Sequence, residues 1–475
     1  MQFFLLKMFD QSNISILDYM YILLLITRYS ATKYFYLSHQ GQPMLNVPKL
    51  PLVLFIQALL VSPAFASEQS ESKGFVEDAN GSILLRTGFI DRDKKNVAPG
   101  VDTRSSVQSA IVNLDSGFTQ GTVGFGAGVV GDFSFKLGDN KHSGNQMVPR
   151  DSNGNPYDQW TRGGGYVKAR VSNTTLVYGT QVLDIPVLAS NTARMVPEYF
   201  TGTLLTSHEI KNLEVIAGEF TKDQMSDQIA TDQNHLKRAY VWGAKYKFND
   251  QFNASYYGLD SKDKLTRHYA NVNFKQPLSA DSSLTYDLSG YHTEWDKGAS
   301  ASISKYDATS SDRSNNIWAF STTYNKGPHS LMLAYQQSTG NSAYDYGENA
   351  DGFQSIYLPN SYVSDFNGRG EKSLQLQYNV DLGAFGVPGL SFTTAYVYGW
   401  DINTYTYDHA VNTTKNAKES EFFNQFKYTV QSGFAKGVSL RLRESIYRNS
   451  QSYGDIYMPD TNETRIFLDI PVKLF

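Results

Sequence analysis

Two arginines spaced two positions apart, Arg441 and Arg443, form the pattern in this sequence that most directly suggests chemistry. They lie in residues 437–448, GVSLRLRESIYR, where apolar and polar side chains alternate. Because successive side chains of a β-strand point to opposite faces, both guanidinium groups share one face, while Leu440 and Leu442 share the other. A guanidinium keeps its charge and binds a carboxylate through two parallel hydrogen bonds. On the wall of a water-filled pore, this pair would meet passing anions.

The same alternation recurs along the chain in segments separated by turns. In residues 284–291, for example, Leu284, Tyr286 and Leu288 alternate with polar side chains. One strand of a soluble β-sandwich would look similar, but dense repetition of strands of about ten residues is typical of an outer-membrane β-barrel. There is no segment with helical periodicity and no Gly/Ser linker. We therefore expect an all-β fold, a transmembrane antiparallel β-barrel that forms one domain.

The composition excludes several other classes of protein. The 475 residues include no Cys, which removes disulfides, thiolate metal sites and cysteine nucleophiles. The net charge of -4 argues against a nucleic-acid-binding protein, which usually carries a basic excess. The 32 Tyr and 28 Phe fit the aromatic girdles of a membrane barrel. No metal-ligand or phosphate-binding motif is present, so we expect no cofactor and no metal.

The N-terminal region has the features of a targeting segment. Residues 44–66 combine Lys49, an apolar core at 50–61 and the small-x-small site Ala64-Phe65-Ala66, which predicts a signal peptide cleaved after Ala66. The core is shorter than the roughly 20 residues that a spanning helix needs. Residues 1–43 are interpreted as an over-extended start, with Met44 as the true initiator. An anchor at residues 19–26 is the alternative, but that run is also too short to span.

Basic residues recur on the polar face of other predicted strands. An Arg or Lys facing lipid at the bilayer midplane costs about 2–4 kcal/mol, so these side chains must face the lumen if their strands span the membrane. There they either pair with lumen acids such as Asp287, or form a file of weak sites along which a carboxylate moves. The residues alone leave both roles open, and we call the second a basic ladder. Its predicted members are Arg86, Lys168, Arg170, Lys427, Arg441 and Arg443.

Two long segments interrupt the strand pattern. Residues 184–199, DIPVLASNTARMVPEY, contain two prolines and Arg194, and are more apolar than a solvated loop. We expect this segment to fold into the barrel and pack on its wall, although an ordinary outer loop is the alternative. Residues 339–371 form the longest loop, which is acidic and includes Asp365.

Several blocks of the sequence together resemble the OprD family of outer-membrane carboxylate channels. The resemblance extends from Gly74 to Phe475, in consistent order. It implies eighteen strands, a narrow eyelet with inward-folded loops, a basic ladder, and uptake of small carboxylates such as amino acids across the outer membrane of a Gram-negative bacterium. The blocks are GFVEDANGSILLRTGFIDRD, DSGFTQGTVGFG, SDFNGRGEKS, GVPGLSF and VQSGFAKGVSLRLRESIYR.

The resemblance assigns roles to individual residues. Arg441 and Arg443 match the RxR pair of the family, Arg86 matches the LR motif of the first strand, and Lys168 and Arg170 match a basic strand motif. Asp365, in SDFNG, matches the eyelet loop, and Arg194 is expected in an eyelet loop as well. One position departs from the pattern, because Ala395 stands where relatives often carry a basic residue. One rung of the ladder is thus missing, and substrate preference should not be copied from any one relative.

The expected partners follow from the same resemblance. They are small carboxylate solutes, outer-membrane lipid and lipopolysaccharide, and the barrel assembly machinery, for which the terminal Phe475 suits the recognition signal. No nucleic-acid partner is expected. The chain is expected to be a monomer or a weak trimer.

Three other functions are the alternatives to a selective porin. A barrel hydrolase needs a nucleophile, a His and an acid in close geometry, but the eight His are expected in loops or near turns, and no GxSxG motif accompanies them. A plugged receptor needs a globular domain before the first strand, and residues 67–73 are too few. A general diffusion porin is the main alternative, and it would pass neutral sugars as readily as carboxylates of equal size.

Overall fold

The computed structural model describes residues 67–138, 143–231, 236–299, 313–346, 356–406 and 413–475. The predicted signal peptide and the over-extended start both lie in residues 1–66, outside the described residues. Within the described part, no helix is both long enough and apolar enough to cross a membrane.

Eighteen β-strands account for most of the described chain, which confirms the predicted all-β fold. Apart from the strands, the named elements are the short helices η2 (Leu382–Phe385), η3 (Thr404–Thr406) and α4 (Gln451–Gly454). The strands are β1 (Asn80–Lys94), β2 (Thr103–Asp115), β3 (Val123–Lys136), β4 (Gln159–Val171), β5 (Thr174–Gln181), β6 (Tyr199–Ser207), β7 (Leu213–Gln224), β8 (Ala239–Lys247), β9 (Phe252–Ser261), β10 (Leu265–Pro277), β11 (Ser282–Trp295), β12 (Ser314–Lys326), β13 (His329–Gly340), β14 (Lys372–Asp381), β15 (Leu390–Ile402), β16 (Ala417–Thr429), β17 (Ser439–Asn449) and β18 (Thr461–Lys473).

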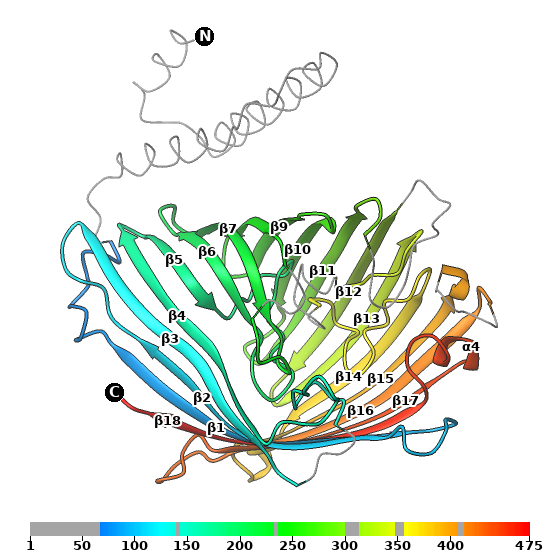
Figure 1. Cartoon of the computed structure of the whole chain (residues 1–475). Helices are drawn as coiled ribbons and strands as arrows, with labels where there is room; N and C mark the ends of the chain where they lie inside the picture. The colour runs from blue at the N-terminus through cyan, green and yellow to red at the C-terminus, as the bar shows by residue number, and fades with distance from the viewer. Residues whose placement is uncertain (1–66, 139–142, 232–235, 300–312, 347–355, 407–412) are drawn as a thin grey trace, which may run out of the picture. The chain divides into compact units, whose positions relative to one another are not determined.

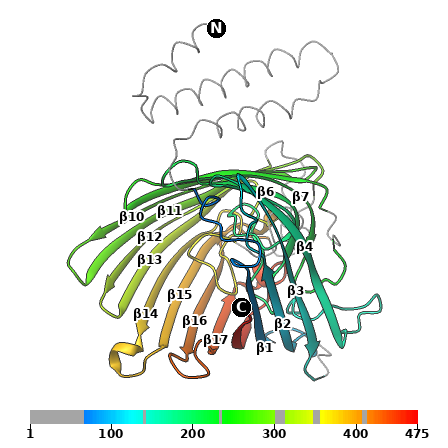
Figure 2. The ribbon, with the colours of Figure 1, turned by 90° about the vertical axis from the view of Figure 1, so that its left-hand side faces the viewer.

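The strands form one closed antiparallel sheet in which each strand pairs with its neighbours in sequence. Figure 1 shows this succession from β1 through the green and yellow strands to β18. The barrel closes where β18 pairs with β1, with Asp469 opposite Arg86 and Phe467 opposite Gly88. Figure 2 shows this seam, where the C-terminus lies beside β1 and β17. Closure leaves no strand edge unpaired, which is the condition for a sheet in hydrocarbon.

The two faces of each strand differ as the alternation predicted. On β17, the apolar side chains of Leu440 and Leu442 are 48% and 42% exposed on the outer face, while Tyr447 on the inner face is fully buried. On β3, Phe125 and Phe133 are likewise exposed on the outer face. In water, large exposed apolar side chains on most of the strands would be costly, so this outer surface fits hydrocarbon.

Two loops fold into the barrel, which confirms the prediction for the segment beginning at Asp184. In the loop 182–198, between β5 and β6, Val187 and Leu188 have no exposed surface. They share a buried apolar cluster with side chains of the loop 341–371, between β13 and β14. Tyr291 on β11 joins the two loops, because its hydroxyl donates to the Pro186 carbonyl at 3.0 Å and accepts from the Tyr357 amide at 3.0 Å. The apolar residues that are unusual for a solvated loop thus pack inside the barrel.

Candidate functional site

All six predicted ladder residues lie on inward-facing strand positions. Arg441 and Arg443 follow each other on the inner face of β17, and Lys427 lies directly opposite Arg441 on β16. Residues two apart on a strand are about 6.6–6.8 Å apart. Three cationic side chains therefore occupy one small patch of the inner wall. We call Lys427, Arg441 and Arg443 the open patch.

In the described structure, no acid is bound directly to the side chains of the open patch, although Asp469 lies near Arg441, and Glu421 and Glu463 lie near Arg443. Among the residues that the structure describes, none forms a hydrogen bond or ion pair with the side chains of Lys427, Arg441 or Arg443, and Arg441 Nε is buried without any partner. Each arginine instead contacts an aromatic ring of a neighbouring strand. The Arg441 guanidinium lies 5.0 Å from the Phe467 ring, and that of Arg443 lies 5.0 Å from the Phe423 ring. The donors of the two guanidinium groups are therefore not bound to other side chains in the described structure, although the Nε of Arg441 is buried.

Arg86, by contrast, is paired across the seam of the barrel. Its Nε and Nη2 donate to the two carboxylate oxygens of Asp469 at 2.7 and 2.9 Å. Its Nη1 also reaches the carbonyls of Arg194 and Met195 in the loop 182–198, each at 3.4 Å. Such a bidentate pair leaves little of the guanidinium for a passing anion.

Lys168 and Arg170 on β4 are also held by neighbouring groups. Lys168 donates to Asp115 at 2.6 Å. Arg170 donates to the Gln69 side chain at 3.1 Å and lies 3.7 Å from the Glu68 carboxylate. Both cations lie over the Phe118 ring, at 4.5 and 4.1 Å. These contacts match the alternative role, pairing with lumen acids, for three of the six predicted residues.

Asp287, the acid suggested by the sequence as a partner, binds none of the six cations in the described structure. Its carboxylate accepts from the amides of Asn271 and Asn273 at 2.9 to 3.0 Å. It belongs to β11, whereas the cations belong to β1, β4, β16 and β17. The side chains that hold the three paired cations come from β18, which is adjacent to β1, from β2, which is two strands away from β4, and from the segment before β1.

Arg194 and Asp365, the two predicted eyelet residues, lie in the two inner loops. Arg194 is 4% exposed and donates to Gln146 at 3.2 Å. Its burial, reinforced by the charges of Arg465 and Arg92, lowers its pKa. The Asp365 carboxylate accepts from Tyr346 and Ser361, and burial raises its pKa.

Both residues were predicted to line the constriction of the pore. In the described structure, the side chain of each is already bound to other side chains. Arg194 lies close to the charges of Arg465 and Arg92, while Asp365 is bonded within its own loop. The predicted contact of either residue with a solute remains a prediction.

A cavity of about 530 Å³ lies against β2–β5 on the barrel wall, and the loop 182–198 contributes Pro197 to it. The polar side chains of Asp115, Tyr166 and Lys168 line it. The room for these side chains comes from glycines on β3, since a Cβ on Gly128 would lie 2.2 Å from the Tyr166 ring. This hollow belongs to the lumen, on the side of the barrel where Lys168 and Arg170 are paired.

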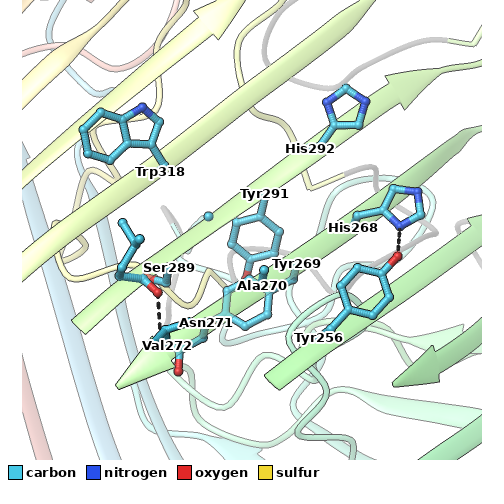
Figure 3. A pocket seen from close by; sticks show the side chains of 12 residues that line it. Tyr256, His268, Tyr269, Ala270, Asn271, Val272, Ser289, Tyr291, His292 and Trp318 are labelled. Carbon is cyan, nitrogen blue, oxygen red and sulfur yellow. Dashed lines mark hydrogen bonds between the residues drawn. The ribbon is translucent and has the colours of Figure 1, made fainter. Parts of the chain in front are cut away.

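A second hollow, of about 440 Å³, belongs to the outer wall (Figure 3). Its floor is formed by Ala270 and Gly290, which occupy adjacent outward positions of β10 and β11. His268 and His292 lie beside it with their rings 6.4 Å apart, and Trp318 lines it from β12. Because Trp318 and the neighbouring Val272 are exposed on the outer face, this hollow is separate from the lumen.

Several residues of the lumen were missed by the sequence reasoning. The alternation in β18 places Arg465 and Phe467 inward, but nothing local indicates their partners. Arg465 is 2% exposed and pairs with Glu463, and Phe467 is 1% exposed between two strands that carry arginine. Phe423 lies in a run of alternating residues without any distinguishing feature. Only strand register could have revealed these contacts.

Known proteins with a similar sequence or structure share this barrel architecture. Residues 73–474 match the family model described as outer membrane porin, OprD family. Porin D of Pseudomonas aeruginosa is 36% identical over 436 residues, which covers 87% of this chain and 95% of that protein. The crystal structure of OccAB1 of Acinetobacter baumannii superimposes with a TM-score of 0.82 at 66% identity, covering 86% of this chain and 100% of that one.

Two further structures of Pseudomonas aeruginosa proteins contain small organic acids. OccK2 (OpdF) in complex with glucuronate has a TM-score of 0.70 at 26% identity, over 85% of this chain and 100% of that one. OpdK with vanillate has a TM-score of 0.72 at 25% identity, over 84% of this chain and 100% of that one.

Proposed function

This chain belongs to the OprD family of outer-membrane porins, and from that premise we propose that it selects small solutes carrying a carboxylate, through the open patch of Lys427, Arg441 and Arg443. As a member of this family it is a channel of the Gram-negative outer membrane for small solutes, and it is not an enzyme. The proposal concerns its selectivity.

The observation that carries the proposal is that, in the described structure, no carboxylate forms a hydrogen bond or ion pair with the side chains of the open patch. Of the six predicted ladder cations, three are paired in the described structure and three are not, and the unpaired ones are neighbours on β16 and β17. An unpaired guanidinium keeps its fork of donors free for a carboxylate. The glucuronate and vanillate of the two related structures both carry a carboxylate, which supports the same chemistry here.

The mechanism needs several moderate sites, because a channel must release what it binds. A carboxylate bound at Arg443 would find Arg441 about 6.6–6.8 Å further along the strand. Lys427, opposite Arg441, would hold the carboxylate as a point charge during the exchange. The paired residues Arg86, Lys168 and Arg170 would contribute to the positive field of the wall without binding the solute directly.

The test removes the two guanidinium groups together and compares solutes that differ in charge. In liposome-swelling assays with the double variant Arg441→Gln/Arg443→Gln, we expect glucuronate uptake to fall roughly tenfold, because a hydrogen bond to a charged group contributes about 1.5–3 kcal/mol. Glucose uptake should be unchanged. The chloride-to-potassium permeability ratio, measured from reversal potentials in planar bilayers, should fall in parallel.

Arg448→Gln is the matched control, because Arg448 lies on the same strand but points to the opposite face from Arg441 and Arg443. It should leave both measurements unchanged. If the double variant reduces glucose and glucuronate uptake equally, or reduces neither, the protein is a general diffusion porin and the proposal is wrong.

A further inference from the structure

Ala395 marks an unusual place on the lumen wall. It lies on β15, opposite Gln377 of β14 and Phe423 of β16. Although an alanine side chain cannot fill this position, Ala395 is only 2% exposed. A group from elsewhere in the chain must therefore cover it.

The covering group is Tyr362, from the loop 341–371. Its ring stacks on Phe423 with a centroid distance of 4.2 Å and an interplanar angle of 21°. Its hydroxyl donates to Gln377 and accepts from the Gln375 amide at 2.7 Å. Because Gln377 and Phe423 flank Ala395 on the two neighbouring strands, the Tyr362 side chain must cross β15 over Ala395.

The backbone next to Tyr362 is bound to the same strand of the wall. The amides of Val363 and Ser364 donate to the Glu421 carboxylate at 3.1 Å. Glu421 and Phe423 are two positions apart on β16, so both face inward. This short segment of the loop is therefore held at β14 and β16, which fixes the plane of the tyrosine ring.

The Phe423 ring also contacts Arg443 of the open patch. The Arg443 guanidinium carbon lies 5.0 Å from the ring centroid, and Phe423 is itself 3% exposed. A cation over an aromatic face is stabilised by the ring quadrupole, but only while the ring keeps its orientation. Phe423 is thus the shared member of a stack that joins Tyr362 of the inner loop to a cation of the ladder.

We propose that Tyr362 is a positioning residue for selectivity, which holds the Arg443 guanidinium at the pore wall through the Phe423 ring. The inference rests on the proposed function, in which Arg443 binds the solute. Because Arg443 is already held in one orientation, it loses less side-chain conformational entropy on binding a carboxylate than a mobile arginine would. The inner loop then acts on selectivity without contributing a charge.

The test changes the stack without changing any charge. In Tyr362→Ala, the chloride-to-potassium permeability ratio should fall by roughly two- to fivefold, which is the range expected for loss of an ordered cation–π contact. Ala395→Leu should lower the ratio by a similar factor, because the larger side chain at position 395 displaces the Tyr362 ring. Tyr362→Phe keeps the aromatic ring and should keep most of the permeability ratio of the unmodified protein.

Tyr286→Ala is the control for loss of a stacked tyrosine, because Tyr286 stacks on Phe274 at 6.3 Å, away from the cations. Its permeability ratio should equal that of the unmodified protein. If Tyr362→Ala and Ala395→Leu both fold, as judged by heat-modifiable migration on gels, and both keep the full ratio, the inference is wrong.

A further variant separates this inference from the proposed function. Tyr362→Ala placed in an Arg443→Gln background should produce no additional loss, because the tyrosine acts through the arginine. If Arg443→Gln alone leaves selectivity unchanged, the proposed function fails. If Arg443→Gln lowers selectivity and Tyr362→Ala does not, only the positioning role fails.

Discussion

Arg86 and Arg441 have the same ring as a neighbour but different electrostatic surroundings. Their guanidinium carbons lie 5.4 and 5.0 Å from the Phe467 ring centroid. Arg86 binds Asp469 through two hydrogen bonds, whereas Arg441 has no such partner in the described structure. For single residues, the position of one carboxylate therefore decides which guanidinium a solute can use.

Two substitutions at this pair should act in opposite directions. Asp469→Asn frees Arg86 as a further lumen cation, so the chloride-to-potassium permeability ratio should rise. Arg86→Gln leaves Asp469 without its partner and next to Arg441, so the ratio should fall by roughly two- to fivefold, as expected for a change of about 0.5–1 kcal/mol in a partly exposed ion pair. Reversal potentials in a salt gradient measure both changes, and shifts of the same sign would contradict this assignment.

At the scale of elements, the inner loops are held by a few buried polar anchors. Arg162 on β4 and Asp132 on β3 have fully buried side chains and pair at 3.1 Å. Arg162 also donates to the carbonyls of Met225 and Pro197, while the Tyr199 hydroxyl donates to Asp132 at 3.1 Å. One ion pair thus attaches the end of the loop 182–198 to the wall.

Breaking this anchor should loosen the loop and weaken the fold. In Arg162→Ala, Asp132 becomes a buried, unpaired charge, and the free energy of unfolding should fall by about 3–5 kcal/mol. Urea unfolding in lipid vesicles measures this loss, and single-channel recording should show a larger or noisier conductance. The control is Arg104→Ala, because Arg104 is 69% exposed in its pair with Asp91 and such surface pairs contribute about 0–1 kcal/mol. Equal losses in the two variants would refute the anchor.

At the scale of the whole molecule, closure of the sheet gives every strand one face toward lipid and one toward water or the inner loops. Leu376 on β14 is 53% exposed on the outer wall and lies opposite Leu333, which is also 53% exposed. The inward positions of β9 and β10 instead carry amides such as Asn253 and Asn273. The same sheet is therefore apolar outside and polar inside.

This division predicts how the barrel tolerates a new charge. Leu376→Arg should lower the free energy of unfolding by about 2–4 kcal/mol in vesicles, because the guanidinium would face hydrocarbon. Asn253→Arg introduces the same group on the lumen side and should cost less than about 1 kcal/mol. Equal costs at the two positions would mean that the outer face is not in contact with lipid.

The sequence by itself determined the fold class and the direction of each side chain. Period-two alternation is local, so the inward placement of residues such as Arg441, Arg443 and Lys427 could be predicted from a few neighbours. The inward folding of the loop containing Arg194 could be predicted as well, since its apolar residues had to be buried somewhere. The eighteen strands were implied by a resemblance that extends over the whole barrel.

Only the tertiary structure decided which predicted cations are free and which are paired. Arg86 and Asp469 are 383 positions apart in sequence, and they meet only because the last strand pairs with the first in one register. The stack of Tyr362 on Phe423 likewise joins a loop to a strand that is not its neighbour in sequence. Alternation specifies the face of a side chain, but closure and register specify its partner, and the partner decides whether a charge is available to a solute.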